Sequence, residues 1–292
     1  MHISVLLKET IDLLKPEQGN HVIDGTLGLG GHALHILPKI GSEGHYYGFD
    51  LDEENMKSAQ ERLSGYADQL TFIHDNFAHC NSRLQEIGVH AVDRILLDLG
   101  LSSPHVDEAS RGFSFKQEGP LDMRFDRSKG ITAEYVLNRY SEEDLKKIFY
   151  EYGEERYAPK ITRMILERRR EQPFKMTTDL TGLIDEIMKN PKDKRLVATR
   201  VFQALRIEVN DELSVLRESI PMMLDLLAPG GRLVIMSYHS LEDRIVKHTF
   251  RDHAKNGPFT LLTKKPIVPT EDEIKSNPRS RSAKLRGIEK NL

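Results

Sequence analysis

"HVIDGTLGLGGH" (residues 21–32) joins a short apolar run to a glycine-rich stretch that ends in a histidine. The run at 21–24 has the length and composition of a buried strand. Because glycine lacks a Cβ atom, a loop that contains Gly28, Gly30 and Gly31 lets its backbone approach a ligand closely. The stretch therefore predicts either the site of a nucleotide-like cofactor or an ordinary flexible turn, and by itself it does not decide between them.

The residues around this stretch indicate an α/β fold. An amphipathic helix precedes it and ends before Gly19, and helical patterns alternate with three further apolar runs at 45–50, 70–75 and 92–99. This alternation predicts βαβ units and a parallel sheet. Ligands of such sheets bind at the carboxyl ends of the strands, near the point where the strand order reverses. Three of the four predicted strands end in an aspartate, namely Asp24, Asp50 and Asp75.

The alternation stops near residue 106 and resumes after about residue 199. Between these points we expect only helices, one of which begins with a capping box of Ser141 and Asp144. A long helical pattern follows at 199–220, and "LAPGGRLVIMSYHS" (227–240) restores a strand after a tight turn. We therefore predict a discontinuous core, 1–105 and 200–292, interrupted by a helical insertion at 106–199. The helical patterns within the insertion are 132–140, 141–153, 154–172 and 177–190.

Composition and charge exclude several classes of protein. Charged residues of both signs make up 30% of the 292 residues, which is typical of a soluble globular protein. The single Cys80 cannot form an internal disulfide, no zinc-like Cys/His spacing is present, and neither a signal peptide nor a membrane span is apparent. We expect a cytoplasmic protein without a metal site. The stretch at 275–290 carries six basic side chains and one acid without an apolar run, which predicts a tail that meets a polyanion.

The glycine-rich loop is compatible with two cofactors. Gly28, Gly30 and Ala33, followed by Asp50, satisfy the dinucleotide fingerprint, so the motif does not exclude NAD. S-adenosylmethionine fits the same geometry, because its methyltransferases place acidic residues after the first two strands, where this chain has Asp24 and Asp50. Thr26 departs from the usual pattern by replacing its first glycine. Two later features favour S-adenosylmethionine: Phe77 in "DNF", which is placed to lie near an adenine, and the turn in "LAPGGRLVI".

The end of the fourth strand, "LLDLGLSSPHVD" (96–107), carries polar groups suited to methylation of an amine. Enzymes of this kind often use a polar residue here to accept a hydrogen bond from the target amine. Asp98 holds that position, followed by Ser102 and Ser103. Since an exocyclic amine on a base is a poor nucleophile, such groups must orient its lone pair and stabilise the charge that develops on nitrogen. The alternative is that Asp98 only caps a helix or a loop.

Seven blocks in this order resemble the RsmH (MraW) family: "TLGLGGH", "DLGLSS", "RGFSF", "GPLDMRFD", "YGEER", "FQALRIEVNDEL" and "APGGRLVIMSYHSLEDR". The resemblance implies a Rossmann-like class I sheet that binds S-adenosyl-L-methionine, with a helical insertion. It further implies methylation of N4 of one cytidine in bacterial 16S rRNA, near the decoding centre of the small ribosomal subunit. By position, the implied cofactor contacts are Gly30, Gly31, His32, Asp50, Phe77, Asp98 and His105, the last replacing a glutamine that many members carry.

The remaining functional expectations concern the substrate. Tyr238 and His239 follow the fifth predicted strand and are expected to contact the RNA, whereas Glu242, Asp243 and Arg244 are expected to begin a helix. We expect the insertion to recognise RNA, with the target cytosine held by Arg111, Phe113 and Phe115. An NAD-linked oxidoreductase and a non-catalytic RNA-binding protein are the alternatives. Binding of S-adenosylmethionine rather than NAD distinguishes a methyltransferase from the oxidoreductase, and turnover distinguishes it from the non-catalytic RNA-binding protein. The oligomeric state is not predicted.

Overall fold

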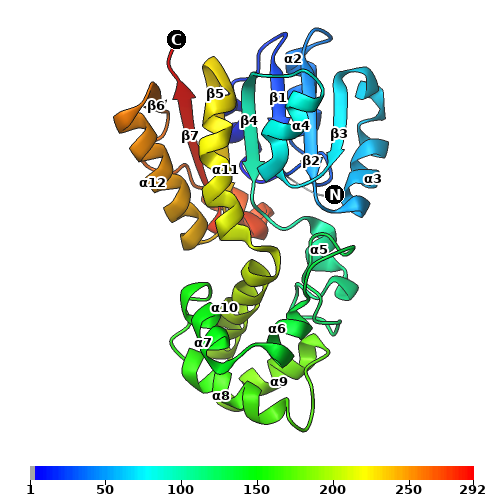
Figure 1. Cartoon of the computed structure of the whole chain (residues 1–292), viewed down its shortest axis with the longest axis vertical. Coiled ribbons are helices and arrows are strands. Elements are labelled where there is room, and N and C mark those ends of the chain that lie inside the picture. Colours follow the sequence, from blue (N-terminus) through cyan, green and yellow to red (C-terminus); the bar gives the residue numbers. More distant parts are fainter. Residues whose placement is uncertain (1–3) are drawn as a thin grey trace. The chain divides into compact units, whose positions relative to one another are not determined.

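The computed structural model describes residues 4–292 and divides the chain into two compact units (Figure 1). The sheet unit contains the chain up to Gly100 together with Leu213–Leu292, and the helical unit is Leu101–Glu212. The helical unit is therefore longer at both ends than the predicted insertion, 106–199. At its far end the reason is packing, because helix α10 (Pro191–Asn210) contacts α6, α7 and α9 of the helical unit along its length.

The sheet unit is built on seven strands in the order β3-β2-β1-β4-β5-β7-β6. The first five strands of this order are parallel, and β7 runs antiparallel to both of its neighbours. The predicted parallel α/β sheet is confirmed. The strands are β1 (His21–Asp24), β2 (His45–Asp50), β3 (Leu70–His74), β4 (Val92–Asp98), β5 (Leu227–Ser237), β6 (Phe259–Leu261) and β7 (Lys284–Lys290).

The basic stretch that the sequence indicated to be a tail ends in a strand, because β7 lies between β5 and β6. Leu285 and Ile288 are fully buried on opposite faces of the sheet, and the intervening Arg286 pairs with Asp243. The sequence hides this strand because its two apolar residues are separated by arginine and glycine. An interior strand of this kind gains its stability from pairing on both edges, which a search for apolar runs does not detect.

Helices cover both faces of the sheet. Consecutive residues such as Val22 and Ile23 point to opposite faces, as the period of a strand requires. One face packs against α1, α2 and α3, and the other packs against α4, α11 and α12, of which α4 and α11 lie in front of the sheet in Figure 1. The helices of this unit are α1 (Leu7–Leu14), α2 (Ala33–Ile40), α3 (Glu53–Arg62), α4 (Cys80–Glu86), α11 (Glu212–Leu226), α12 (Ser240–Asn256) and α13 (Glu271–Ser276).

The helical unit has its own apolar core, which includes Phe149, Phe174 and Leu205. The long pattern at 199–220 is two helices, because Asp211 adopts a left-handed conformation (φ 48°) between α10 and α11. Ser141 caps α7 by accepting the N–H of Asp144, which is half of the predicted capping box. Within residues 4–292, no helix combines the length and apolarity needed to cross a membrane. The remaining helices are α5 (Ser103–Asp107), α6 (Ala133–Arg139), α7 (Glu142–Glu151), α8 (Ala158–Arg168) and α9 (Thr177–Ile187).

Candidate active site

The candidate site lies at the carboxyl ends of the parallel strands. From β1 the chain builds β2 and β3 on one side and β4 and β5 on the other, so the strand order reverses between β1 and β4. A crevice outside the strand ends at such a point is the usual ligand site of an open α/β sheet. The glycine-rich loop follows β1 at this edge. Asp50, Asp98 and Tyr238 come from the ends of β2, β4 and β5.

The loop at 25–32 is held in place by hydrogen bonds to its two neighbouring strands. The N–H of Gly28 donates to Oδ2 of Asp50 at 2.7 Å. The hydroxyl of Thr26 accepts the N–H of Asp98 at 2.6 Å, so the residue that departs from the usual glycine pattern ties the loop to the end of β4. Gly30 has φ +73°, and a Cβ atom there would lie 2.8 Å from Leu63. The left-handed conformation favours glycine at position 30, and a larger residue there would also displace the Leu63 side chain.

Two of the strand-end aspartates support the site from different positions. Asp50 accepts backbone N–H groups on both oxygens, from Gly28 and from Asp52 at 2.7 Å each. Asp24 is buried, and it accepts the hydroxyl of Tyr46 at 2.7 Å and the N–H of Thr26 at 3.1 Å. Burial raises the pKa of Asp24 to about 6, against the opposing effect of the Tyr46 hydrogen bond. Asp24 thus supports the loop through the N–H of Thr26.

Phe77, which is predicted to lie near an adenine, is located next to the loop. It begins the short helix Phe77–His79 after β3, and a Cβ atom on Gly25 would lie 2.8 Å from its own Cβ. The neighbouring Asp75 is engaged elsewhere, since His79 and Arg83 bond it at 2.8 and 2.7 Å. Burial opposes ionisation of Asp75, but these partners outweigh it and lower its pKa to about 2. Of the two residues, only Phe77 is placed to pack against a ligand in the loop.

Asp98 lies between two side chains that the sequence also singled out. The hydroxyl of Tyr238 donates to its Oδ1 at 2.8 Å, and Nδ1 of His32 lies 3.8 Å from its Oδ2. Nε2 of His32 is 3.3 Å from the carbonyl oxygen of Val5, which orients the buried ring. Burial, followed by the charge of Asp98, raises the pKa of Tyr238 well above its ordinary value. Tyr238 is therefore a protonated donor to Asp98 at neutral pH.

The segment after β5 combines predicted and unpredicted roles. Glu242 forms a capping box with His239, the residue before α12, and Asp243 pairs with Arg286 and Lys284. The expectation that Glu242 and Asp243 begin a helix and form ion pairs is confirmed. The Nδ1 of His239 accepts the N–H of Glu242 at 3.4 Å, and its Nε2 lies 3.1 Å from the Glu242 carboxylate; the expected contact of His239 with the RNA stays a prediction. Its ring is thus used as the cap of α12.

The other predicted residues belong to the helical unit and form a cluster within it. Ser102 caps α5, of which Ser103 is the first residue, and the ring of His105 completes the capping box. The His105 ring lies 5.0 Å from the Phe113 ring and 5.2 Å from that of Phe125. These contacts give His105 a packing role in this unit that its sequence neighbours did not reveal.

The three residues expected to hold the cytosine are partly or fully enclosed in this unit. The guanidinium of buried Arg111 donates to the carbonyl oxygens of Arg124 and Phe125 at 3.0 and 3.1 Å. Phe113 is 8% exposed, and Phe115 is partly buried with its ring edge-on to Phe202. Arg111 is therefore an internal brace, and of the three only Phe115 keeps a partly accessible ring.

The sheet unit thus brings three polar features to the ends of its parallel strands. They are the glycine-rich loop, the carboxylate of Asp50 at the end of β2, and the Asp98 carboxylate with its Tyr238 partner at the ends of β4 and β5. This combination can hold a nucleoside-like cofactor and accept a hydrogen bond from an amine. Sequence reasoning missed Tyr46 and the bridging role of Thr26. A tyrosine within an apolar strand carries no signal for Tyr46, whereas a hydroxyl in place of a motif glycine was a usable signal for Thr26.

The chain is similar in sequence to a family of known proteins. Residues 1–291 match the model of the MraW methylase family. The ribosomal RNA small subunit methyltransferase H of Halothermothrix orenii is 44% identical over 308 aligned positions, which cover 100% of this chain and 99% of the relative. Among solved structures, an rRNA methylase from Streptococcus thermophilus has a TM-score of 0.45 at 14% identity, covering 100% of both chains. NSun6 from Pyrococcus horikoshii has a TM-score of 0.48 at 13% identity, covering 99% of this chain and 53% of its own.

Proposed function

Because the chain belongs to the MraW methylase family, we propose that it methylates N4 of a specific cytidine in 16S rRNA of the small ribosomal subunit, near the decoding centre. The methyl donor is S-adenosylmethionine, and the sheet unit is the proposed class I methyltransferase core. The observation that carries the proposal is the 44% identity, over the whole chain, to a protein named as a small-subunit ribosomal RNA methyltransferase. The cytoplasm is the corresponding location.

The residues at the sheet edge fit this cofactor. The carboxylate of Asp50 is fixed at the end of β2 by the N–H groups of Gly28 and Asp52, where it is suited to the ribose hydroxyls. Gly30 and Gly31 are the proposed backbone contacts from the loop. Phe77, packed on Gly25, is suited to the adenine ring. His32 and Asp98 complete the set in the sheet unit, and His105 is the proposed contact from the helical unit. When bound, the cofactor supplies a methyl group that its sulfonium already activates for transfer.

Asp98 is the proposed partner of the target amine. Its Oδ1 accepts the Tyr238 hydroxyl, which fixes the carboxylate, and its Oδ2 faces His32. A carboxylate held in this way can accept an N–H of the amine, aim the nitrogen lone pair and stabilise the positive charge that develops on nitrogen. Because Tyr238 keeps its proton, it acts by positioning Asp98 and does not remove a proton from the substrate.

The helical unit is proposed to recognise the RNA. Basic side chains occur along it in "RFDRSKG", "ERRR" and "KDKR", and phosphate contacts of such side chains supply most of the affinity for RNA. A single cytidine within a long RNA also requires recognition of folded shape, which favours the small subunit over naked RNA as the substrate. Ser102, Ser103 and Phe115 are the residues of this unit that we propose to lie nearest the base.

The test is methyl transfer to the proposed nucleoside. Purified protein is incubated with labelled S-adenosylmethionine and small subunits from cells that lack this enzyme, and the RNA is digested for nucleoside mass spectrometry. We expect N4-methylcytidine with the natural chain and none with Asp98→Ala. Asp50→Ala is expected to lose cofactor binding itself. A methyl group on another base, or binding of NAD in place of S-adenosylmethionine, contradicts the proposal.

A further inference from the structure

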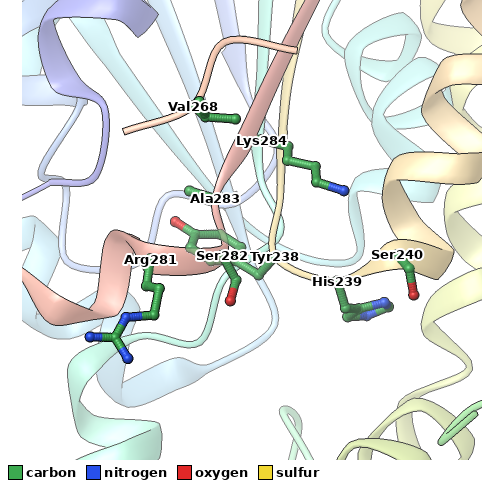
Figure 2. Close-up of a pocket in the computed structure, with 8 residues that line it drawn as sticks. All are labelled: Tyr238, His239, Ser240, Val268, Arg281, Ser282, Ala283 and Lys284. Atoms are coloured by element: carbon green, nitrogen blue, oxygen red, sulfur yellow. The ribbon is translucent and has the colours of Figure 1, made fainter. Parts of the chain in front are cut away.

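A hollow of about 370 Å³ lies where the end of β5 meets the segment that enters β7. Figure 2 shows the side chains that line it, which come from the loop after β5, the first residue of α12, Val268 and the segment from Arg281 to Lys284. The lining includes two permanent cations, Arg281 and Lys284, and the hydroxyls of Ser240 and Ser282. No acidic residue is among the eight lining residues. The hollow is therefore lined by donors that suit an anion.

The ion pairs beside the hollow join two cations to a single carboxylate. Nζ of Lys284 lies 3.3 Å from Asp243, but the same carboxylate accepts Arg286 at 2.7 Å. Although burial opposes it, these two cations hold the pKa of Asp243 below its ordinary value. The Asp243 carboxylate thus forms ion pairs with both Lys284 and Arg286. Arg281 is exposed, and no ion pair joins it to another residue within 4–292.

The second carboxylate next to the hollow is engaged by the backbone. Oε2 of Glu242 accepts the N–H groups of Tyr238 and His239 at 2.7 and 3.2 Å, as part of the cap of α12. A carboxylate that points at its own helix terminus is fixed there by those bonds and by the helix dipole. It does not neutralise Arg281 on the other wall of the hollow.

The hollow shares Tyr238 with the proposed methyl-transfer site. The Tyr238 side chain lines the hollow, and its hydroxyl is bonded to Asp98. An anion bound in the hollow thus lies beside the tyrosine that is bonded to the Asp98 carboxylate. In a nucleic acid, the group that combines negative charge with closeness to the reacting base is the phosphate of the same or the adjoining nucleotide.

We infer that Arg281 and Lys284 form a binding site for a phosphodiester of the substrate RNA, next to the nucleotide whose base is methylated. The inference rests on the proposed function, because it takes RNA as the substrate. It gives the basic residues near the C-terminus a role as a fixed site on the sheet unit. A phosphate held there anchors the target nucleotide while its base reaches Asp98.

The experiment compares two charge-matched double variants of the full chain. Arg281→Gln with Lys284→Gln removes the site, and Arg251→Gln with Lys255→Gln removes the same charge from the far half of α12. Arg281→Gln alone is a further variant, since it leaves the Asp243 ion pairs intact. We measure kcat and KM for small subunits, the Kd for S-adenosylmethionine, and binding of an RNA oligonucleotide containing the target cytidine across a range of salt concentrations.

For the site variant we expect KM for small subunits to rise about tenfold, as the loss of charged hydrogen bonds to phosphate implies, with kcat changed less than about twofold. The slope of log affinity against log salt is expected to fall by about 0.7 for each phosphate of a single strand that the variant no longer neutralises. The α12 control and the Kd for S-adenosylmethionine are expected to match the natural chain. Arg281→Gln alone is expected to show an intermediate loss.

Three outcomes overturn the inference. The first is a KM and a salt slope for the site variant that equal those of the α12 control. The second is an equal loss of affinity for S-adenosylmethionine, which assigns the hollow to the cofactor. The third is binding of inorganic phosphate to the natural chain as tight as that of the RNA and dependent on Arg281. If the natural chain methylates no RNA, the proposed function fails, and the salt slope of oligonucleotide binding still decides whether Arg281 and Lys284 contact phosphate.

Discussion

The phenol of Tyr238 donates a 2.8 Å hydrogen bond to Oδ1 of Asp98, across the neighbouring strands β4 and β5. Asp98 pairs with Met236 in the sheet, so Tyr238 follows two residues beyond that register position. One oxygen of the carboxylate is thereby fixed, and the other faces the His32 ring. The bond sets the direction in which Asp98 can accept a hydrogen bond from an amine.

Tyr238→Phe tests this positioning role. Removing the hydroxyl leaves the ring in place but frees the carboxylate of Asp98, and a hydrogen bond to a charged group contributes about 1.5–3 kcal/mol. We expect kcat for methyl transfer to fall about 10- to 100-fold, with little change in the Kd for S-adenosylmethionine. Single-turnover methylation and calorimetry measure the two quantities. An unchanged kcat excludes Tyr238 from the positioning of Asp98.

Thr26→Val tests the link between the glycine-rich loop and β4. Valine has the shape of threonine but cannot accept the N–H of Asp98, which is then left without its partner. An unpaired, partly buried N–H costs about 1–3 kcal/mol. We expect the free energy of unfolding to fall by about this amount in urea titrations and cofactor affinity to decrease. Thr26→Ser, which keeps the hydroxyl, is the control and is expected to retain most of both.

The parallel part of the fold could be predicted because its strands are short apolar runs that end in polar residues. Strands β1 and β2 have the predicted bounds, and the predicted β3 and β4 are each one residue longer than observed. Strand β7 could not be predicted in this way, because burial of Arg286 depends on Asp243, which lies 43 residues away in sequence. Local patterns carry no information on such a distant ion pair.

Site residues could be predicted from the sequence where they lie at the end of a parallel strand. Asp50, Asp98 and Tyr238 lie at strand ends, and the rule for parallel sheets brings strand ends together. Arg111 and Phe113 were chosen for their chemical type, and the structure encloses both in the helical unit. An arginine that donates to backbone carbonyl groups and one that binds RNA cannot be told apart by sequence, so only the fold distinguishes them.

The buried Asp24 predicts an unusual dependence of stability on pH. Its pKa is raised to about 6 in the folded protein, so between about pH 4 and pH 6 the folded state binds more protons at this site than the unfolded state. Stability from this group is therefore full below about pH 4 and is lost as pH rises through 6, by about 3 kcal/mol. We expect Asp24→Asn to remove this loss. We measure the unfolding free energies of both proteins from pH 4 to 7.5 and expect the gain of the variant over the natural chain to be largest at pH 7.5. A difference that is constant with pH contradicts the raised pKa of Asp24.

Phe113 separates packing from base recognition in the helical unit. Its ring stacks on Phe125 at 5.5 Å and lies 5.0 Å from His105, with only 8% of the residue exposed. Truncation to alanine in such a place costs about 3–5 kcal/mol. We expect Phe113→Ala to lower the thermal stability and the methylation of small subunits together, so this variant alone cannot distinguish the two roles.

Phe113→Leu makes the distinction, because leucine fills most of the space but cannot stack on a base. If Phe113 serves only to pack the cluster, this variant regains most of the stability that Phe113→Ala forfeits and methylates with nearly the natural kcat. If the ring holds the target cytosine, stability returns while kcat stays low, because base–aromatic stacking of about 1–3 kcal/mol is still missing. From the burial of the ring we expect the first result, and Phe115→Leu, at the partly exposed ring, is expected to give the second.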